Sequence, residues 1–327
     1  MELLALTAAE VRQALPMSAA IKGMKEAFAR LSAGKGVMPL RSRVATERGV
    51  SLFMPAYAEG DESLAVKVVS VFPDNSQKNL PVVAGVVLVV AADTGMPVAL
   101  LEGSVLTAIR TGAASGAATD VLARREARVA AIIGSGVQAR TQLEAICAVR
   151  EIEEVRVYSR SKVNRERFVA EVAGRNGITE RVYSAETAGE AVAGAEIICA
   201  ATTSSEPVFA ADEVALGAHI NGVGSYTAEM QEVDVTGLRG GRVYVDSLEA
   251  AWAEAGDLIR PWQAGEIEKD FVVGELGAVL NGEVEGRLGG DDITYFKSVG
   301  VAIQDARAAA MVVQRARELG LGQLVSL

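Results

Sequence analysis

The stretch that most constrains the fold is residues 129–139, VAAIIGSGVQA. Five apolar residues lead into the turn GSG at 134–136, and a segment with helical character follows from about Gln138. A strand, a glycine turn and a helix in this order predict a βα unit whose backbone approaches the pyrophosphate of a dinucleotide. The first glycine permits the tight turn, the second leaves room for phosphates, and Ala139 lets helix and strand pack closely. N–H groups at the helix start favour the negative charge.

A second strand, at 155–159, follows at the distance expected in a Rossmann fold, and its end bears on the choice of cofactor. Enzymes that use NAD place Asp or Glu there to bind the ribose 2′-hydroxyl. This chain has Ser159 and Arg160, with Lys162 beside them. A hydroxyl and an arginine suit a 2′-phosphate, so the sequence favours NADP(H), with NAD(H) as the second choice. The alternative is a turn at a helix start with an exposed arginine.

Composition excludes several classes of protein. The chain has 327 residues, which predicts two domains. Its net charge is −10, whereas a nucleic-acid-binding protein typically carries a basic surface, so nucleic-acid binding is not expected. No apolar run reaches about 18 residues, so no membrane span is expected. The N-terminus has no basic region typical of a signal peptide, and the two cysteines are isolated. We therefore expect a cytoplasmic protein.

The single histidine, His219, excludes a zinc site with several His ligands and lies in an apolar run where a structural role is expected. Chemistry must then rely on Lys, Arg, carboxylates and a cofactor. Lys67 lies within the apolar run LAVKVVSVF and needs a partner there. Arg41, Lys67 and Arg110 together predict a cationic pocket that binds a carboxylate. Alternatively, Arg110 is a solvated arginine on a helix of small residues expected from about 107 to 123.

The N-terminal block reads as two helices, at 8–15 and 18–32, followed by strands and turns. The strands are expected at 41–46, 50–54, 64–71, 82–90 and 97–102. A long Ala-rich helix at 299–319 is expected to return to this block. The fold class is thus α/β, with a Rossmann-type dinucleotide-binding domain at 119–299. The second domain is a discontinuous α+β domain for substrate binding and dimerisation, at 1–118 and 300–327.

Further strands at 197–201 and 219–223 are followed by loops at the edge where open parallel sheets bind ligands. The loop that begins with Val223 and Gly224 is expected near the nicotinamide end of a bound cofactor. Ala201 and Thr202 leave the preceding strand at the same edge.

Several stretches, in order along nearly the whole chain, resemble the ornithine cyclodeaminase/mu-crystallin family. They are MPLR at 38–41, VK at 66–67, RTGAA at 110–114, GSGVQA at 134–139, HINGVGS at 219–225, EAGD at 254–257, FKSVG at 296–300 and AIQD at 302–305. The motifs are most similar to those of the ketimine reductase and mu-crystallin-like members. The resemblance implies a homodimer and chemistry at the carbon–nitrogen bond of a small α-imino or α-amino acid. It places the substrate carboxylate on Arg41, Lys67 and Arg110.

The resemblance also extends the set of expected cofactor residues, adding a phosphate contact at Thr111 and a segment near the nicotinamide at Lys297 and Ser298. The full expected set is Gly134, Ser135, Gly136, Val137, Gln138, Ser159, Arg160, Thr111, Ala201, Thr202, Val223, Gly224, Lys297 and Ser298.

Two positions depart from ornithine cyclodeaminase. Tyr226 stands where that enzyme has an Asp after its HxNxxGx segment, and Leu52 stands where it has a Glu before its MP pair. Both carboxylates that would interact with the nitrogens of a diamine are missing. An ammonium group left unpaired in a closed site is costly in free energy. The prediction is therefore an NAD(P)H-dependent reductase of a cyclic ketimine, Δ1-pyrroline-2-carboxylate or Δ1-piperideine-2-carboxylate. Lys67 or water is the candidate proton source, and Tyr226 a weaker one.

Two other functions stay open. One is ornithine cyclodeaminase or an activity like that of alanine dehydrogenase. The other is a binding protein that holds NADPH and a small ligand with little turnover, against which the intact cationic trio argues.

Overall fold

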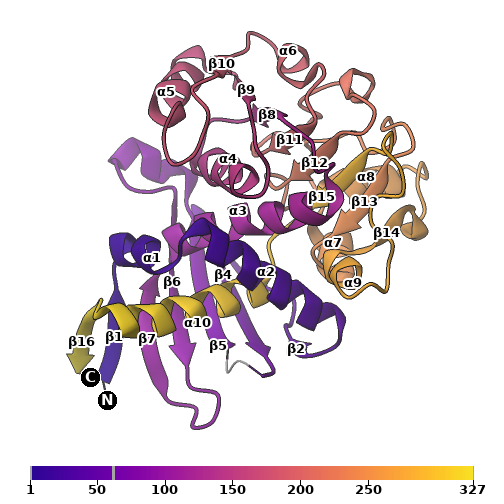
Figure 1. Ribbon diagram of the computed structural model, residues 1–327. Coiled ribbons are helices and arrows are strands. Elements are labelled where there is room, and N and C mark those ends of the chain that lie inside the picture. Colours follow the sequence, from indigo (N-terminus) through magenta and orange to yellow (C-terminus); the bar gives the residue numbers. More distant parts are fainter. Residues whose placement is uncertain (1, 61–62, 327) are drawn as a thin grey trace. The chain divides into compact units, whose positions relative to one another are not determined.

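The structure, a computed structural model, describes residues 2–60 and 63–326. The chain divides into two compact units (Figure 1). The first unit is Met1–Arg110 with Val301–Leu327, and the second is Thr111–Gly300. The prediction placed the first border after residue 118, whereas the division falls within helix α3 (Gly103–Leu122). The fold class is the predicted one, because one unit holds a parallel Rossmann-type sheet and the other a mixed sheet covered by helices.

The sheet of the first unit has the strand order β16-β1-β7-β6-β5-β4-β2, and β3 also pairs with β4. Its pairs are antiparallel except β1 with β7, which is parallel. The strands are β1 (Glu2–Leu6), β2 (Gly36–Val37), β3 (Ser42–Thr46), β4 (Gly49–Ala58), β5 (Ser63–Val71), β6 (Val83–Val90), β7 (Pro97–Glu102) and β16 (Gln323–Ser326). The two strands nearest the termini, β1 and β16, were not expected from sequence.

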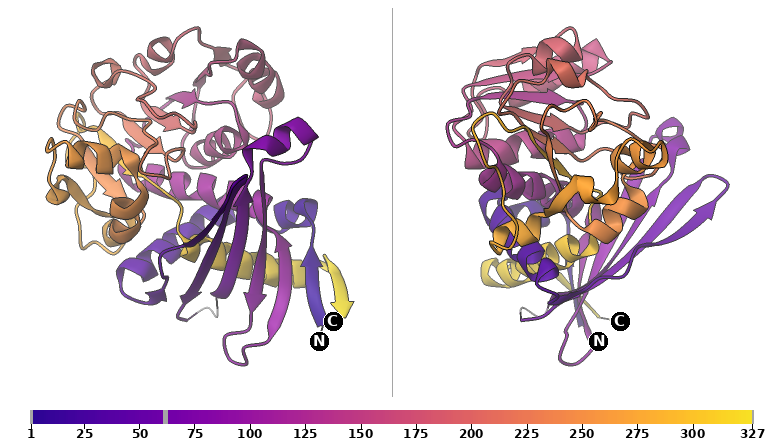
Figure 2. Two further views of the ribbon diagram at one scale, coloured as in Figure 1. Left: turned by 180° about the vertical axis from the view of Figure 1, so that it is seen from behind. Right: turned by 90° about the vertical axis from the view of Figure 1, so that its right-hand side faces the viewer.

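Helices cover one face of this sheet. They are α1 (Ala8–Ala14), α2 (Met17–Ser32) and α10 (Ala302–Leu319), and a short 3-10 turn, η1 (Pro73–Lys78), follows β5. The predicted capping box forms at α1, where Thr7 Oγ1 accepts from the backbone of Glu10 and the Glu10 carboxylate accepts from the backbone of Thr7. Helix α10 packs on β4, β5 and α2, and both views show it lying across the strands (Figures 1 and 2).

The strands of this sheet alternate between the two faces. On β4, Leu52 and Met54 are buried while Phe53 is 38% exposed. Lys67 on β5 pairs in register with Met54, so its side chain belongs to the covered face. The opposite face carries apolar residues. Cross-strand pairs join Phe53 to Val68 and Val68 to Val86, and a second row joins Pro55, Val66, Leu88 and Leu100. We call these seven residues the apolar sheet face.

The second unit contains a parallel sheet of the order β10-β9-β8-β11-β12-β15-β13-β14. Its strands are β8 (Val129–Ile133), β9 (Glu154–Tyr158), β10 (Val182–Ser184), β11 (Ile197–Ala200), β12 (His219–Gly222), β13 (Arg242–Val245), β14 (Val272–Glu275) and β15 (Thr294–Lys297). The helices are α4 (Val137–Val149), α5 (Lys162–Val172), α6 (Ala188–Val192), α7 (Leu248–Glu254), α8 (Gly256–Gln263) and α9 (Leu276–Leu280), with 3-10 turns η2 (Ala211–Glu213) and η3 (Lys269–Phe271). The strand order reverses between β8 and β11, which is the switch point of doubly wound folds.

Helix α3 begins at Gly103, earlier than the predicted start near residue 107. The carboxylate of Glu102 explains the difference, because it accepts hydrogen bonds from the backbone N–H groups of Ser104 and Val105. Arg110 and Thr111 therefore lie in the middle of the helix instead of near its start.

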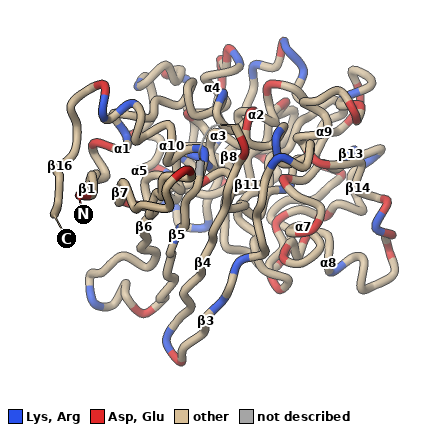
Figure 3. The backbone as a smooth tube through the Cα atoms, turned by 90° about the horizontal axis from the view of Figure 1, so that it is seen from below, with Lys and Arg blue, Asp and Glu red and all other residues tan. Residues whose placement is uncertain are grey.

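The remaining expectations concern charge and composition. Basic and acidic residues are interspersed along both units (Figure 3). Within residues 2–60 and 63–326, no helix is both long enough and apolar enough to cross a bilayer, and no cluster of His, Cys, Asp and Glu could hold a metal ion. Both cysteines are free, and burial raises the pKa of each thiol to about 12.

Candidate functional site

The turn after β8 requires glycine at its first position. Gly134 has φ of +118° and its N–H donates to the carbonyl of Tyr158 at 2.8 Å. A Cβ built at Gly134 would lie 2.5 Å from the carbonyl oxygen of Ala201, too close for any other residue. The turn therefore joins the ends of β8, β9 and β11 at the carboxyl edge of the sheet.

The second glycine of the turn faces open space. Gly136 is the N-cap of α4, and among the described residues no side chain caps this helix. A Cβ at Gly136 would meet none of their atoms within 4 Å, and Val137 is 65% exposed. The N–H groups of the first turn thus point at an accessible surface, where they favour an anion. These residues fit the pyrophosphate of a dinucleotide.

The loop after β9 is fastened to this turn. Ser135 Oγ donates to Ser159 Oγ at 3.0 Å, and Arg165 of α5 donates to the carbonyl of Ser159 at 3.2 Å. Arg165 is buried and also donates to Ser184 Oγ at 2.9 Å. Arg160, one residue further, is exposed. The loop is therefore fixed by Arg165 and not by the exposed Arg160.

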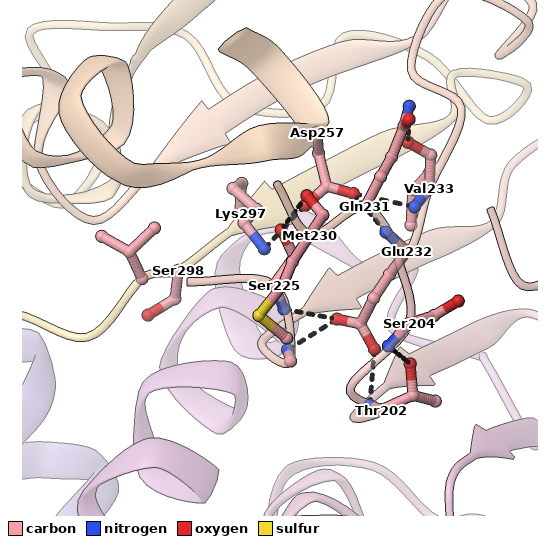
Figure 4. Close-up of polar contacts among 12 residues, drawn as sticks. Thr202, Ser204, Ser225, Met230, Gln231, Glu232, Val233, Asp257, Lys297 and Ser298 are labelled. Atoms are coloured by element: carbon pink, nitrogen blue, oxygen red, sulfur yellow. Dashed lines mark hydrogen bonds and ion pairs between the residues drawn. The ribbon is translucent and has the colours of Figure 1, made fainter. Parts of the chain in front are cut away.

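The predicted residues after β11 and β12 come together around an acid that sequence reasoning missed. Figure 4 shows the carboxylate of Glu232 between the two loops. It accepts from the N–H of Thr202 at 2.5 Å, of Gly224 at 2.6 Å and of Ser225 at 3.0 Å. Glu232 is fully buried, and burial raises its pKa while the Lys297 ammonium opposes that shift. Ala201, Thr202, Val223 and Gly224 are each partly exposed at this edge.

The three residues added by the resemblance lie in the interior of the second unit. Lys297 has no exposed surface, and its ammonium lies 2.8 Å from the carboxylate of Asp257. Ser298 Oγ donates to Asp246 at 2.8 Å. Thr111 is 7% exposed, and its carbonyl accepts from Gln142 Nε2 at 3.2 Å. The ammonium of Lys297 thus has a protein carboxylate as its partner, and cofactor contacts by these residues stay predictions.

In the first unit, a single carboxylate joins two of the three predicted cations. Asp305, at the start of α10, lies 2.7 Å from Lys67 Nζ through one oxygen and 2.9 Å from Arg110 Nε through the other. Arg110 Nη1 also donates to Gln304 Oε1 at 2.8 Å. Arg41, immediately before β3, is close enough for its charge to act on Lys67. The cluster therefore has three cations around one carboxylate.

This environment changes the acidity of Lys67. Burial lowers the pKa of Lys67 to about 7, Asp305 opposes the shift, and Arg110 and Arg41 add to it. Burial alone would raise the pKa of Asp305, but Arg110 and Lys67 hold it below its usual value. A lysine with a pKa near neutrality can donate a proton and take it back. Tyr226, the weaker candidate donor, is partly exposed in the segment after β12, in the second unit.

The missed residues were only partly visible in the sequence. A lysine in an apolar strand requires a counter-charge, but nothing in its neighbourhood identified Asp305, which is 238 positions away along the chain. Asp305 and Asp257 both occur in stretches quoted for the resemblance, AIQD and EAGD. Glu232 had no such signal.

Comparisons with known proteins agree with this geometry. The model of the ornithine cyclodeaminase/mu-crystallin family matches residues 1–320. Delta(1)-pyrroline-2-carboxylate reductase from Bacillus cereus is 39% identical over 326 residues, covering 99% of this chain and 99% of that protein.

Two solved structures are similar over essentially the whole chain. Delta(1)-pyrroline-2-carboxylate reductase from Thermococcus litoralis, in complex with NADH and L-proline, has a TM-score of 0.94 and 41% identity, covering 98% of this chain and 99% of that chain. An archaeal alanine dehydrogenase dimer with bound NAD has a TM-score of 0.93 and 34% identity, with complete coverage of both chains.

Proposed function

Because this chain belongs to the ornithine cyclodeaminase/mu-crystallin family, we propose that it reduces the C=N bond of a small cyclic α-imino acid with NAD(P)H. Δ1-pyrroline-2-carboxylate, which gives L-proline, is the first substrate to test, and Δ1-piperideine-2-carboxylate is the second. The observation that carries the proposal is the cluster of Arg41, Lys67 and Arg110 around Asp305. Relatives named for this reductase activity, and one that binds NADH and L-proline, support it.

The cationic cluster has capacity left for a substrate carboxylate. Asp305 and Gln304 take two hydrogen bonds of Arg110, from Nε and Nη1, so the guanidinium keeps further donors in a fixed orientation. Arg41 contributes a further positive charge that acts on Lys67. An α-imino acid bound by its carboxylate would have its C=N bond placed next to these cations, which makes the reaction effectively unimolecular.

Reduction needs a hydride at carbon and a proton at nitrogen. The reduced nicotinamide, when bound, supplies the hydride to the imine carbon. Lys67 is the group of this chain best suited to supply the proton, because its ammonium titrates near pH 7 and is buried among charges that fix its position. The resulting neutral amine of Lys67 then regains a proton from solvent.

Two positions of the chain argue against a diamine substrate. Leu52, at the position where ornithine cyclodeaminase has a Glu, is 6% exposed and lies on the helix-covered face of the first sheet, as does Lys67. Tyr226 replaces the second carboxylate. A side-chain ammonium would find neither of these two counter-ions, and its desolvation would be uncompensated.

The decisive experiment is an assay of the purified protein with both ketimines and both reduced nucleotides, following nicotinamide absorbance. Oxidation of NADPH or NADH that depends on either ketimine is expected. Proline and ammonia from ornithine with catalytic NAD would instead indicate a cyclodeaminase. NAD-dependent pyruvate formation from alanine would indicate an alanine dehydrogenase. Tight nucleotide binding without turnover would indicate a binding protein.

The preference for NADP(H) over NAD(H) rests on the end of β9. Arg160 is exposed beside Ser159, and the exposed Lys162 begins α5, so two cations near the end of β9 would be available to a 2′-phosphate. For Arg160→Ala we expect the ratio of kcat/KM for NADPH to that for NADH to fall about tenfold, the scale of one charge-assisted contact. The control is Arg167→Ala, which changes an exposed arginine of α5. An unchanged ratio would overturn the preference.

The protein is also proposed to act in the cytoplasm as a homodimer. The apolar sheet face is contiguous across β4, β5, β6 and β7, and such faces mark interaction sites. The similar alanine dehydrogenase is a dimer. Light scattering should give twice the chain mass, and Phe53→Glu should shift the protein towards monomer. A monomeric wild type would refute the homodimer.

A further inference from the structure

Glu232 connects the loop that follows β11 with the loop that follows β12. Thr202 follows β11, and Gly224 and Ser225 follow β12. These strands are adjacent and parallel, so both loops leave the same edge of the sheet. The three N–H donors use both carboxylate oxygens, one receiving Thr202 and the other receiving Gly224 and Ser225. One buried side chain therefore sets the spacing of the two loops (Figure 4).

The loops approach each other too closely for any side chain at Gly224. A Cβ there would lie 2.1 Å from the carbonyl oxygen of Thr202 and 2.5 Å from the carboxylate of Glu232. The backbone of one loop thus packs directly against the backbone of the other. The two loop ends are therefore in direct contact beside the carboxylate that bridges them.

Glu232 is itself held by a second pair of charges. Asp257, at the start of α8, accepts from the N–H of Glu232 at 2.7 Å and of Val233 at 2.8 Å through one oxygen. Its other oxygen lies 2.8 Å from Lys297 Nζ. Lys297 ends β15, where it pairs in register with Gly222 of β12. The segment that carries Glu232 is therefore anchored to the sheet whose loops it bridges.

The position of these loops identifies which end of the cofactor they would meet. In a doubly wound sheet each half receives one nucleotide. The glycine turn and the loop after β9 belong to the half formed by β8, β9 and β10, whereas Thr202 and Gly224 belong to the half that begins with β11. The first half suits the adenosine side, so the second faces the nicotinamide side.

We propose that Glu232, anchored by Asp257 and Lys297, is a positioning residue that fixes the two loops receiving the nicotinamide half of the dinucleotide. This rests on the proposed function. Both carboxylate oxygens of Glu232 accept backbone N–H groups of these two loops, so Glu232 is expected to act through the loops. Its replacement should affect binding of the nicotinamide half while leaving binding of the adenosine half intact.

The test compares two probes by calorimetric titration: NADPH, and 2′-phospho-ADP-ribose, which lacks only the nicotinamide. Glu232→Gln keeps the size of the side chain but replaces one accepting oxygen by an N–H₂ group, which leaves buried N–H groups without an acceptor. We expect the Kd for NADPH to rise about tenfold or more, the scale of an unsatisfied buried group. The Kd for the fragment should stay within about twofold, which corresponds to no lost hydrogen bond.

Two further variants separate positioning from folding. Glu232→Asp keeps the carboxylate and should restore part of the NADPH affinity. Glu229→Gln, which changes an exposed acid of the same segment, should bind both probes as the wild type does. NADPH fluorescence gives a second readout, since the emission of the bound nicotinamide should be weaker in Glu232→Gln than in the wild type.

The outcomes are distinguishable. Equal NADPH affinity in Glu232→Gln and wild type would overturn the inference, and so would a parallel loss of both probes, which would mean that Glu232 supports the whole unit. Wild-type protein that binds neither NADPH nor NADH would instead refute the proposed function, and the inference would fall with it.

Discussion

Two buried lysine–aspartate pairs, one in each unit, have nearly the same geometry and opposite surroundings. Lys67 lies 2.7 Å from Asp305, and Lys297 lies 2.8 Å from Asp257, all four side chains at most 2% exposed. Arg110 and Arg41 act on the first pair, so cations outnumber carboxylates there. Glu232 acts on the second, so carboxylates outnumber the cation.

The difference teaches that an ion pair by itself does not mark a binding site. Burial lowers the pKa of Lys67, Arg110 and Arg41 add to that shift, and the excess of cations around Asp305 leaves donors for an anion from outside. The two carboxylates near Lys297, those of Asp257 and Glu232, accept hydrogen bonds from backbone N–H groups of the protein itself. We therefore regard the first pair as ligand-binding and the second as supporting, and the predictions below test that division.

The largest effect is expected from Lys67→Met, which keeps the length of the side chain and removes its charge and proton. Asp305 retains Arg110 as a partner, so folding should survive. The value of kcat/KM for Δ1-pyrroline-2-carboxylate should fall about 10³-fold, the range of general acid catalysis. Lys78→Met, at an exposed position, serves as the control. A loss below about 10²-fold, the lower end for general acid catalysis, would exclude Lys67 from that role.

A smaller loss, about 10²-fold in kcat/KM, is expected from Asp305→Asn, because Lys67 and Arg110 lose the group that orients both. This variant also has a signature in pH. Asp305 raises the pKa of Lys67, so its removal should move the descending limb of the pH profile to lower pH. Glu318→Gln, near the other end of α10, should leave the limb in place. A limb that does not move would mean that Asp305 does not act through Lys67.

In the wild type, the pH profile itself is the third test. The Lys67 ammonium is protonated below its pKa of about 7 and loses its proton above it. For a proton donor, kcat/KM should be level at lower pH and then fall about tenfold for each pH unit above 7. A rate that increases through this range would show that the neutral amine is the active form.

Lys297→Met should have the smallest effect on catalysis and is the matched counterpart of Lys67→Met. Removing one partner of a buried pair costs about 3 kcal/mol of unfolding free energy, so thermal or denaturant unfolding should detect it. The pH limb assigned to Lys67 should keep its midpoint, while KM for the nucleotide rises a few-fold because Asp257 no longer holds Glu232 firmly. A shifted limb would contradict the division between the two pairs.

The sequence alone was sufficient for the fold class and for the family. The glycine turn could be read because its requirement is local: Gly134 needs positive φ and Gly136 needs open space in front of a helix start. The cationic trio could be proposed because a lysine in an apolar strand demands a partner. The departures at Leu52 and Tyr226 were equally visible, since each is a change of one residue within a motif.

Tertiary structure alone decided which charges meet. Asp305 reaches Lys67 and Arg110 only because α10 returns to the first unit and packs across β5. Glu232 bridges two loops only because β11 and β12 are neighbours in the parallel sheet. Both contacts join residues that are distant along the chain, and no local preference encodes them. The sequence determined which groups are present, and packing determined whether a buried lysine–aspartate pair is surrounded by further cations or by a further carboxylate.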